Sequence, residues 1–140
     1  MKDRYFLDSN IITYTFDNKA EKKQTTSTQL VRNGLTSGNA IISYQVIQEF
    51  CNVATKKFKP PITQLELDQY VDIILTPLCQ SWPSIRLYQK AIMLQKSTKY
   101  GFYDSLIIAS ALQEKCTLLY SEDLQHNQTI ESLTILNPFK

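Results

Sequence analysis

Four carboxylates in this 140-residue sequence interrupt or directly follow apolar runs: Asp8, Glu49, Asp104 and Asp123. The other Asp and Glu residues lie in polar surroundings and need no special explanation. Four carboxylates brought together would repel one another, and burial would increase the repulsion. A hard divalent cation such as Mg²⁺ or Mn²⁺ removes this conflict, because such ions prefer oxygen ligands. The reaction class that suits such a centre is metal-assisted hydrolysis of a phosphodiester.

The elements that would position these acids alternate along the chain. Strands are expected over residues 4–8, 39–43, 116–121 and 133–136, with a shorter one around 78–81. Helical patterns fill the intervals, over residues 9–16, 19–37, 44–57 and 63–78, then from Ile85 and again around Asp104. Short apolar strands separated by helices are typical of a parallel sheet with both faces covered. The predicted fold class is therefore α/β, with three layers and a central parallel sheet of four to five strands flanked by helices.

Two of the four acids lie at the ends of expected strands. Asp8 ends the strand at 4–8, and Asp123 comes just after the strand at 116–121. In open parallel sheets, ligands bind outside the carboxyl ends of the strands. We therefore expect both side chains at the same edge of the sheet.

The other two acids lie on helices beside that edge. Glu49 follows the second strand by about two helical turns, on the apolar side of its helix, among Val46, Phe50 and Val53. Asp104 precedes Ile107 and Ile108 by three and four residues, so it stands at the head of an apolar stripe. A helix that is apolar nearly all round is usually buried, and it would hold this acid in a fixed place.

Each acid also has an ordinary structural interpretation. Asp8 and Asp104 are suitable N-caps for the helices that follow them, since Asp is a preferred N-cap residue. Glu49 could pair with a lysine, and Asp123 could be a turn residue with Glu122 equally well placed beside it. Convergence on one metal centre is the single explanation that covers all four positions.

The amino-acid composition limits which kinds of protein this chain can be. Hydrophobic residues make up 43% and charged residues 20% of the chain, which is ordinary for a globular protein, and the net charge is +2. We expect no membrane span, because no apolar run approaches the length that a spanning helix needs. We also expect a cytoplasmic location. The three cysteines are far apart and His126 is the only histidine, which argues against a disulfide framework or a zinc centre.

Four segments of the sequence resemble the four motifs of the PIN domain family, from about Tyr5 to Phe139. They are FLDSN, ISYQVIQEF, YDSLIIASAL and LLYSEDLQ, in the order and at spacings compatible with the family. The size and motif order resemble the stand-alone VapC-type toxins of bacterial type II toxin–antitoxin systems. The resemblance implies a single PIN domain over residues 1–140.

The resemblance also implies a sheet ordered 3-2-1-4-5 and an Mg²⁺- or Mn²⁺-dependent ribonuclease. By motif position, the catalytic, metal-binding acids are Asp8, Glu49, Asp104 and Asp123. Asn10 and Ser121 match polar positions of the family that support the metal site. The last motif departs from the family at Gln125, where a further acid or histidine is common. This departure leaves Glu122 as a rival fourth ligand and leaves open whether one or two metal ions bind.

The partners implied by the resemblance are an RNA substrate, a small antitoxin protein and a second copy of the chain. The antitoxin would bind near the helices at 44–57 and 63–78. The alternatives are a PIN-fold RNA-processing nuclease without an antitoxin and a non-catalytic nucleic-acid-binding module. A phosphoryl-accepting signalling domain fits poorly, because FLDSN holds one acid and no lysine follows CTLLYS. Tyr100, Phe102 and Tyr103 are candidates to stack on unpaired bases, or else they belong to the core.

Overall fold

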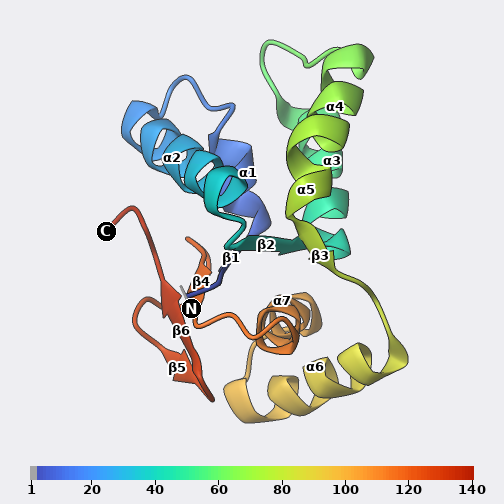
Figure 1. The fold of residues 1–140 in the computed structure, drawn as a ribbon, viewed down its shortest axis with the longest axis vertical. Coiled ribbons are helices and arrows are strands. Elements are labelled where there is room, and N and C mark those ends of the chain that lie inside the picture. Colours follow the sequence, from blue (N-terminus) through green and yellow to red (C-terminus); the bar gives the residue numbers. More distant parts are fainter. Residues whose placement is uncertain (1–2) are drawn as a thin grey trace.

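The computed structural model describes residues 3–140, which form a six-stranded sheet between two layers of helices (Figure 1). The strands are β1 (Tyr5–Leu7), β2 (Ala40–Ser43), β3 (Cys79–Ser81), β4 (Leu118–Tyr120), β5 (Thr129–Ile130) and β6 (Leu133–Leu136). Their order in the sheet is β3-β2-β1-β4-β6-β5. All neighbouring pairs are parallel except β5 and β6, which are antiparallel.

Helices cover both faces of this sheet. They are α1 (Ser9–Tyr14), α2 (Glu21–Ser37), α3 (Tyr44–Lys57), α4 (Gln64–Tyr70), the π-helical segment η1 (Val71–Leu75), α5 (Thr76–Leu78), α6 (Ile85–Thr98) and α7 (Phe102–Gln113). The helices α1 to α5 lie on one side of the sheet, and α6 and α7 lie on the other (Figure 1). This arrangement confirms the predicted three-layer α/β class.

The sheet has one strand more than the four to five that the sequence predicted. The five expected strands are present, and with β6 counted as the fifth they follow the order 3-2-1-4-5. The additional strand β5 forms a hairpin with β6 through the two residues Glu131 and Ser132. Glu131 has a positive φ of 53°. Two-residue hairpin turns of this kind usually carry Asn or Gly, so the sequence offered no signal for the turn.

The expected helix at 63–78 is present but is not regular throughout. Thr63 caps it through a capping box, in which Glu66 N donates to Thr63 Oγ1 and Thr63 N donates to Glu66 Oε1, both at 3.1 Å. Its middle turn, η1, is π-helical, and the backbone N–H of Thr76 bonds to the carbonyl of Val71, five residues before it. Pro77 follows at once and has no N–H to donate, so the wider turn accommodates a proline that an α-helix would not.

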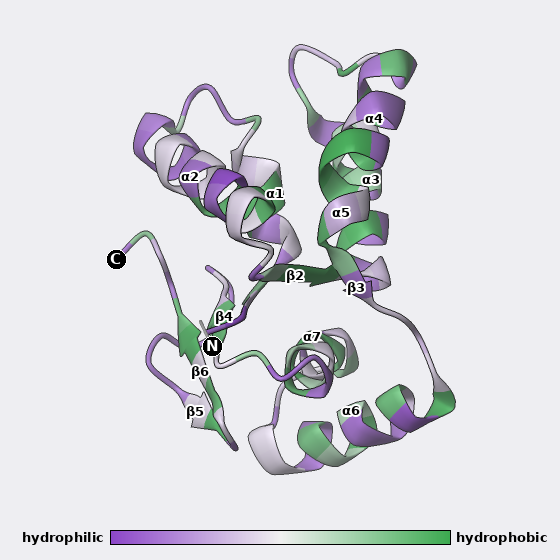
Figure 2. Cartoon of the chain, viewed as in Figure 1, coloured by the Kyte–Doolittle hydropathy of each residue, from purple (hydrophilic) through white to green (hydrophobic). Residues whose placement is uncertain are grey.

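The core lies on both faces of the sheet. Every residue of β2 is buried, as are residues 105–111 of α7, and Figure 2 shows apolar residues over β2. Helix α2 approaches β2 closely at Gly34, where an added Cβ would lie 2.2 Å from the Cβ of Ala40. Glycine is therefore required there by space. Within residues 3–140, none of the helices combines the length and the apolar character needed to cross a bilayer.

Candidate active site

Asp8 lies at the carboxyl end of β1, the central strand of the parallel part of the sheet, and is only 5% exposed. It is the N-cap of α1, and its Oδ1 accepts a hydrogen bond of 2.7 Å from Ser9 N. Its Oδ2 accepts from Ser121 Oγ at 2.7 Å and from Asn10 Nδ2 at 3.4 Å. The capping interpretation therefore accounts for one carboxylate oxygen, while the other faces the end of β4.

Asn10 and Ser121 connect Asp8 with Asp123. Asn10 Nδ2 also donates to Asp123 Oδ2 at 3.2 Å, and Ser121 Oγ accepts from Asp123 N at 3.2 Å. Ser121 is fully buried, whereas Asp123 is exposed. The polar pair therefore holds two acids at one edge of the sheet, although they are 115 positions apart in sequence.

Glu49 is half-buried on α3 and accepts a hydrogen bond from a side chain of the same helix. Gln45, one turn earlier, donates from Nε2 to Glu49 Oε2 at 3.2 Å and to the carbonyl of Tyr103 at 3.0 Å. Gln45 thereby joins α3 to the start of α7, next to Asp104. Among the residues that the structure describes, Glu49 forms no ion pair, so the alternative of a lysine partner does not hold.

Asp104 is exposed in the first turn of α7, whose following residues are buried. The N-cap of α7 is Gly101, three residues earlier, and no side chain caps the helix. The interpretation of Asp104 as a helix cap is therefore wrong. Tyr103 beside it is strongly exposed, whereas the hydroxyl of Tyr100 donates to Gln128 Oε1 at 2.6 Å and is held within the fold.

The charges of the four acids act on one another. Burial, with smaller contributions from the charges of Glu49 and Asp123, raises the pKa of Asp8 to about 6, against the opposing effect of the bonds from Ser121 and Ser9. Burial and the charge of Asp123 likewise raise the pKa of Asp104. Asp8 is thus coupled to Glu49 and Asp123, and Asp123 to Asp104. Among the described residues, none of the four candidate acids forms an ion pair with a lysine or arginine.

These acids suit Mg²⁺ or Mn²⁺ by the type of donor atom they offer. Among residues 3–140, no three Asp, Glu, His or Cys side chains are close enough together to enclose a metal ion by themselves. Mg²⁺ does not need such a cage, because it usually keeps several waters and binds through one or two carboxylates plus substrate phosphates. The side chains therefore fit a hydrated divalent ion better than a fully protein-enclosed one.

Glu122, the rival of Asp123, points toward different partners. Its carboxylate accepts from Lys23 Nζ and from Tyr14 Oη, each at 2.5 Å. Burial would raise the pKa of Glu122, but the hydrogen bonds from Lys23 and Tyr14 lower it overall. An acid already neutralised by a lysine has less free charge to offer a metal ion.

The family model described as PIN domain matches residues 5–130 of the chain. The chain belongs to the PIN domain family. Asp8, Glu49, Asp104 and Asp123 all lie within the matched part of this PIN domain. A search of curated protein sequences found no match.

Solved structures share the PIN fold of this chain at low sequence identity. VapC20 of Mycobacterium tuberculosis, described as a sarcin-ricin loop cleaving toxin, is 14% identical with a TM-score of 0.62, over 85% of this chain and 89% of its own. VapBC2 of Rickettsia felis, bound to a DNA fragment from its promoter, is 21% identical with a TM-score of 0.63, over 94% and 96%. FitAcB of Neisseria gonorrhoeae is 16% identical with a TM-score of 0.63, over 96% and 98%. These likenesses show the fold.

Sequence reasoning missed two contacts of this PIN domain. Gln45 lies four residues before Glu49, on the same helix face, but a glutamine at this spacing is no specific signal of a bond to an acid. The pairing of Lys23 with Glu122 joins residues 99 positions apart, and no local pattern indicates it.

Proposed function

We propose that this PIN domain is a metal-dependent endoribonuclease that hydrolyses RNA phosphodiester bonds, and that it is the toxin of a toxin–antitoxin pair. The observation that carries the proposal is the buried carboxylate of Asp8, whose pKa is raised in part by the charges of Glu49 and Asp123 at one edge of the sheet. We further propose that residues 1–140 act as one domain.

Asp8, Glu49, Asp104 and Asp123 would hold the ion, directly or through its waters. A bound Mg²⁺ or Mn²⁺ would supply an activated water and stabilise negative charge on the phosphodiester. The protein's own contribution is orientation. Ser121 and Asn10 fix the Oδ2 side of Asp8, and Gln45 fixes Glu49 on α3. Residues that orient metal ligands in this way commonly contribute tenfold to a hundredfold to activity.

Asp123 is a better fourth acid than Glu122. Asn10 directs its amide to Asp123 and Asp8 alike, whereas Glu122 is engaged by Lys23 and Tyr14. The number of metal ions does not enter this choice, because either a single ion or a pair would use the acids that carry free charge.

The toxin role and the RNA substrate are supported by the structural neighbours. VapC20 is described as a toxin that cleaves the sarcin-ricin loop. The names VapBC2 and FitAcB each denote two components, as expected of a toxin with its antitoxin. Single-stranded or structured RNA is therefore the substrate class to test first, with a small antitoxin as the partner to seek.

The purified protein is expected to cleave RNA when Mg²⁺ or Mn²⁺ is present and to stop when EDTA is added. The products should carry 5′-phosphate and 3′-hydroxyl ends, because water, and not the ribose 2′-hydroxyl, would attack the phosphorus while the 3′ oxygen departs as the leaving group. Gel analysis of end-labelled RNA measures both. Cleavage that persists in EDTA, or products ending in a 2′,3′-cyclic phosphate, would overturn the assignment. Stable RNA binding without cleavage would favour a non-catalytic module.

Association is the second expectation of the toxin role. The helices predicted to bind the antitoxin expose large apolar side chains, including Leu65 on α4 and Ile73 on η1. We propose a homodimer that binds a small antitoxin at this surface and at α3. Light scattering should give twice the monomer mass, and inducible expression of the soluble protein should arrest growth. A monomer at high concentration would refute the dimer, and unaffected growth would favour an RNA-processing nuclease without an antitoxin.

A further inference from the structure

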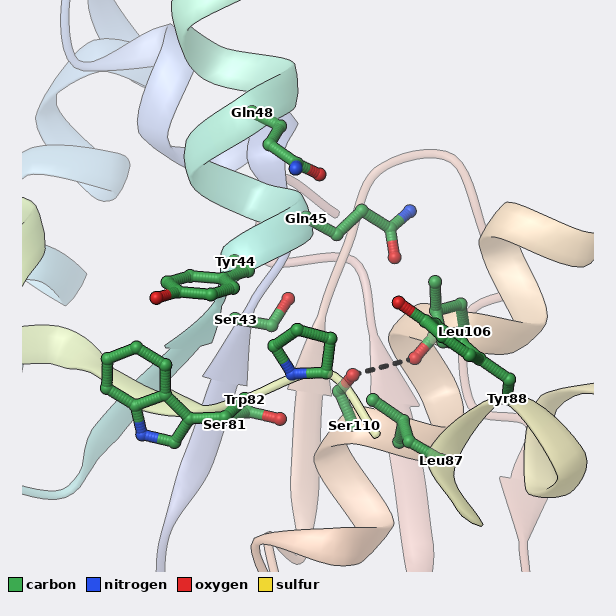
Figure 3. Close-up of a pocket in the computed structure, with 11 residues that line it drawn as sticks. Ser43, Tyr44, Gln45, Gln48, Ser81, Trp82, Leu87, Tyr88, Leu106 and Ser110 are labelled. Atoms are coloured by element: carbon green, nitrogen blue, oxygen red, sulfur yellow. Dashed lines mark hydrogen bonds between the residues drawn. The ribbon is translucent and has the colours of Figure 1, made fainter. Parts of the chain in front are cut away.

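A small pocket lies beside the candidate active site, between the first turn of α3, the end of β3, and the helices α6 and α7 (Figure 3). Its volume is about 80 Å³, whereas a single water needs roughly 10–15 Å³ on the same measure. The pocket is therefore large enough for a small planar group and too small for a folded peptide segment.

Three buried polar side chains line this pocket without a hydrogen-bond partner for one of their atoms. They are the hydroxyls of Ser43 and Ser81 and the amide oxygen of Gln45, in residues that are 3%, 1% and 7% exposed. Buried polar atoms in proteins are nearly always hydrogen-bonded, and leaving one unmade costs free energy. Three such atoms around one pocket leave hydrogen-bonding positions that water can fill and that a polar ligand can take over.

Ser43 shows this most clearly. It occupies the N-cap position of the 14-residue helix α3, where a serine hydroxyl normally accepts from a backbone N–H of the first turn. Here its side chain forms no capping bond and remains among the pocket-lining groups drawn in Figure 3. The Ser43 hydroxyl therefore has no hydrogen-bond partner among the described residues, in α3 or elsewhere.

An exposed aromatic pair stands at the mouth of the pocket. Tyr44 and Trp82 both line it and contact each other edge to face, with ring centroids 4.6 Å apart. Both are exposed, so a ligand in the pocket could contact them. A flat aromatic surface beside unpartnered polar atoms is the combination that proteins use for unpaired nucleobases, which stack on the ring and hydrogen-bond along one edge.

Gln45 connects the pocket to the acids. Its amide oxygen lines the pocket, while its amide nitrogen donates to Glu49 Oε2 at 3.2 Å. A group bound in the pocket is therefore one side chain away from a proposed metal ligand. An RNA strand whose phosphodiester lies at the acids would bring an adjacent base to this position.

We propose that the pocket lined by Ser43, Gln45 and Ser81, with Tyr44 and Trp82 at its mouth, binds the edge of an unpaired nucleobase next to the phosphodiester that is cleaved. The inference rests on the proposed ribonuclease function and adds a determinant of substrate choice. A phosphate group is a poorer occupant, because none of the residues 3–140 that line the pocket is a lysine or arginine. The polar atoms match the donors and acceptors of a base edge, and the serine hydroxyls can serve in either sense.

The single tryptophan of the chain makes a direct test possible. The indole N–H of Trp82 gives one NMR signal, which can be followed while adenosine, cytidine, guanosine or uridine is added to the metal-free protein. At least one nucleoside is expected to move this signal to saturation, whereas ribose and inorganic phosphate should not. No movement up to the solubility limit, or equal movement with ribose or phosphate, would overturn the proposal.

The variant Ser81→Ala is expected to weaken binding of the preferred nucleoside about two- to tenfold, the size of one lost hydrogen bond. Ser27→Ala is the matched control, because Ser27 on α2 is also fully buried with an unpartnered hydroxyl but does not line the pocket. Equal effects of the two variants would contradict the assignment. A Trp82 signal that moves with protein concentration alone would assign the pocket to a contact between copies.

The nucleoside titration tests the pocket independently of the proposed nuclease activity, because it requires neither a metal ion nor RNA cleavage. An active nuclease whose Trp82 signal ignores nucleosides would retain the nuclease function and lose the base pocket. A protein that binds nucleosides at Trp82 but never cleaves RNA would retain the pocket and lose the nuclease function.

Discussion

Replacing Asp104 with Asn is expected to reduce metal-dependent RNA cleavage by at least about a hundredfold, with the fold intact. A metal ion supplies several kcal/mol of stabilisation to the transition state, and each 1.36 kcal/mol corresponds to a factor of ten in rate. Asp104 is exposed at the head of α7 and, among the described residues, accepts no side-chain hydrogen bond that asparagine would lose. Initial rates of cleavage at saturating Mg²⁺, for the variant and the wild type, measure the effect.

The same variant should distinguish a metal-binding role from a structural one by its thermal stability. Without metal, Asp104→Asn should be as stable as the wild type or more stable by up to about 1 kcal/mol. The charge that it removes is disfavoured by partial burial and repelled by Asp123, and water screens part of this cost. A ligand that binds only the folded state stabilises it, by about 2.7 kcal/mol at a hundred times its dissociation constant. Mg²⁺ should therefore raise the melting temperature of the wild type more than that of the variant.

Asp72→Asn is the matched control for this comparison. Asp72 is an exposed helical acid on η1 and is not one of the four candidate acids, so its replacement removes one charge without changing the proposed site. The control should keep wild-type cleavage and the full response to Mg²⁺. Equal metal-induced shifts in the wild type and Asp104→Asn would remove Asp104 from the metal site.

The sheet and the edge that carries the acids could be predicted from the sequence because both depend on short-range patterns. The apolar run before Asp8 and the run before Asp123 identify two strand ends, and parallel strands bring such ends together. The capping box of Thr63 and Glu66 likewise joins residues only three positions apart. The apolar pattern of the sequence does not determine how the side chains at that edge are oriented. The position of Asp104 before an apolar stripe is compatible with a helix cap and with a free acid.

The features that the sequence did not predict all depend on distant partners or on unusual turns. The hairpin of β5 and β6 turns at Glu131 without the residues that usually mark such a turn. Ser43 directly precedes α3, where a serine commonly caps a helix, and only the packing of β3, α6 and α7 around it forms the pocket. Trp82 follows β3 and meets Tyr44 across the sheet edge, although they are 38 positions apart.

Asp8 is expected to make the metal-free protein less stable as the pH rises from about 4 to 7. Its pKa is 3.8 as an ordinary aspartate and about 6 in the folded protein, so the folded state holds the proton more tightly. A group with a raised folded pKa costs stability progressively between these two values, and the cost persists at neutral pH. At 1.36 kcal/mol for each tenfold difference in proton affinity, the cost is about 3 kcal/mol.

Asp8→Asn isolates this cost, because the amide carries no charge at any of these pH values. Urea unfolding in EDTA at a series of pH values should show the wild type losing about 2.5 kcal/mol relative to Asp8→Asn between pH 4 and 7, since a small part of the cost is already present at pH 4. The absolute stability of the variant depends also on the bonds from Ser9 and Ser121, only part of which an amide oxygen can accept. The difference in slope is independent of that loss, since hydrogen bonds to an amide do not titrate.

Mg²⁺ should restore to the wild type at neutral pH the stability that Asp8 removes, because a cation at this carboxylate favours its charged form. Asp8→Asn should gain little from the metal and should cleave RNA at least about a hundredfold more slowly. Asp72→Asn, measured in parallel, should retain the wild-type pH profile, since Asp72 lies outside the cluster. Parallel pH profiles for the wild type and Asp8→Asn would mean that Asp8 is an ordinary helix cap, with its proton bound no more tightly in the folded state than in the unfolded chain.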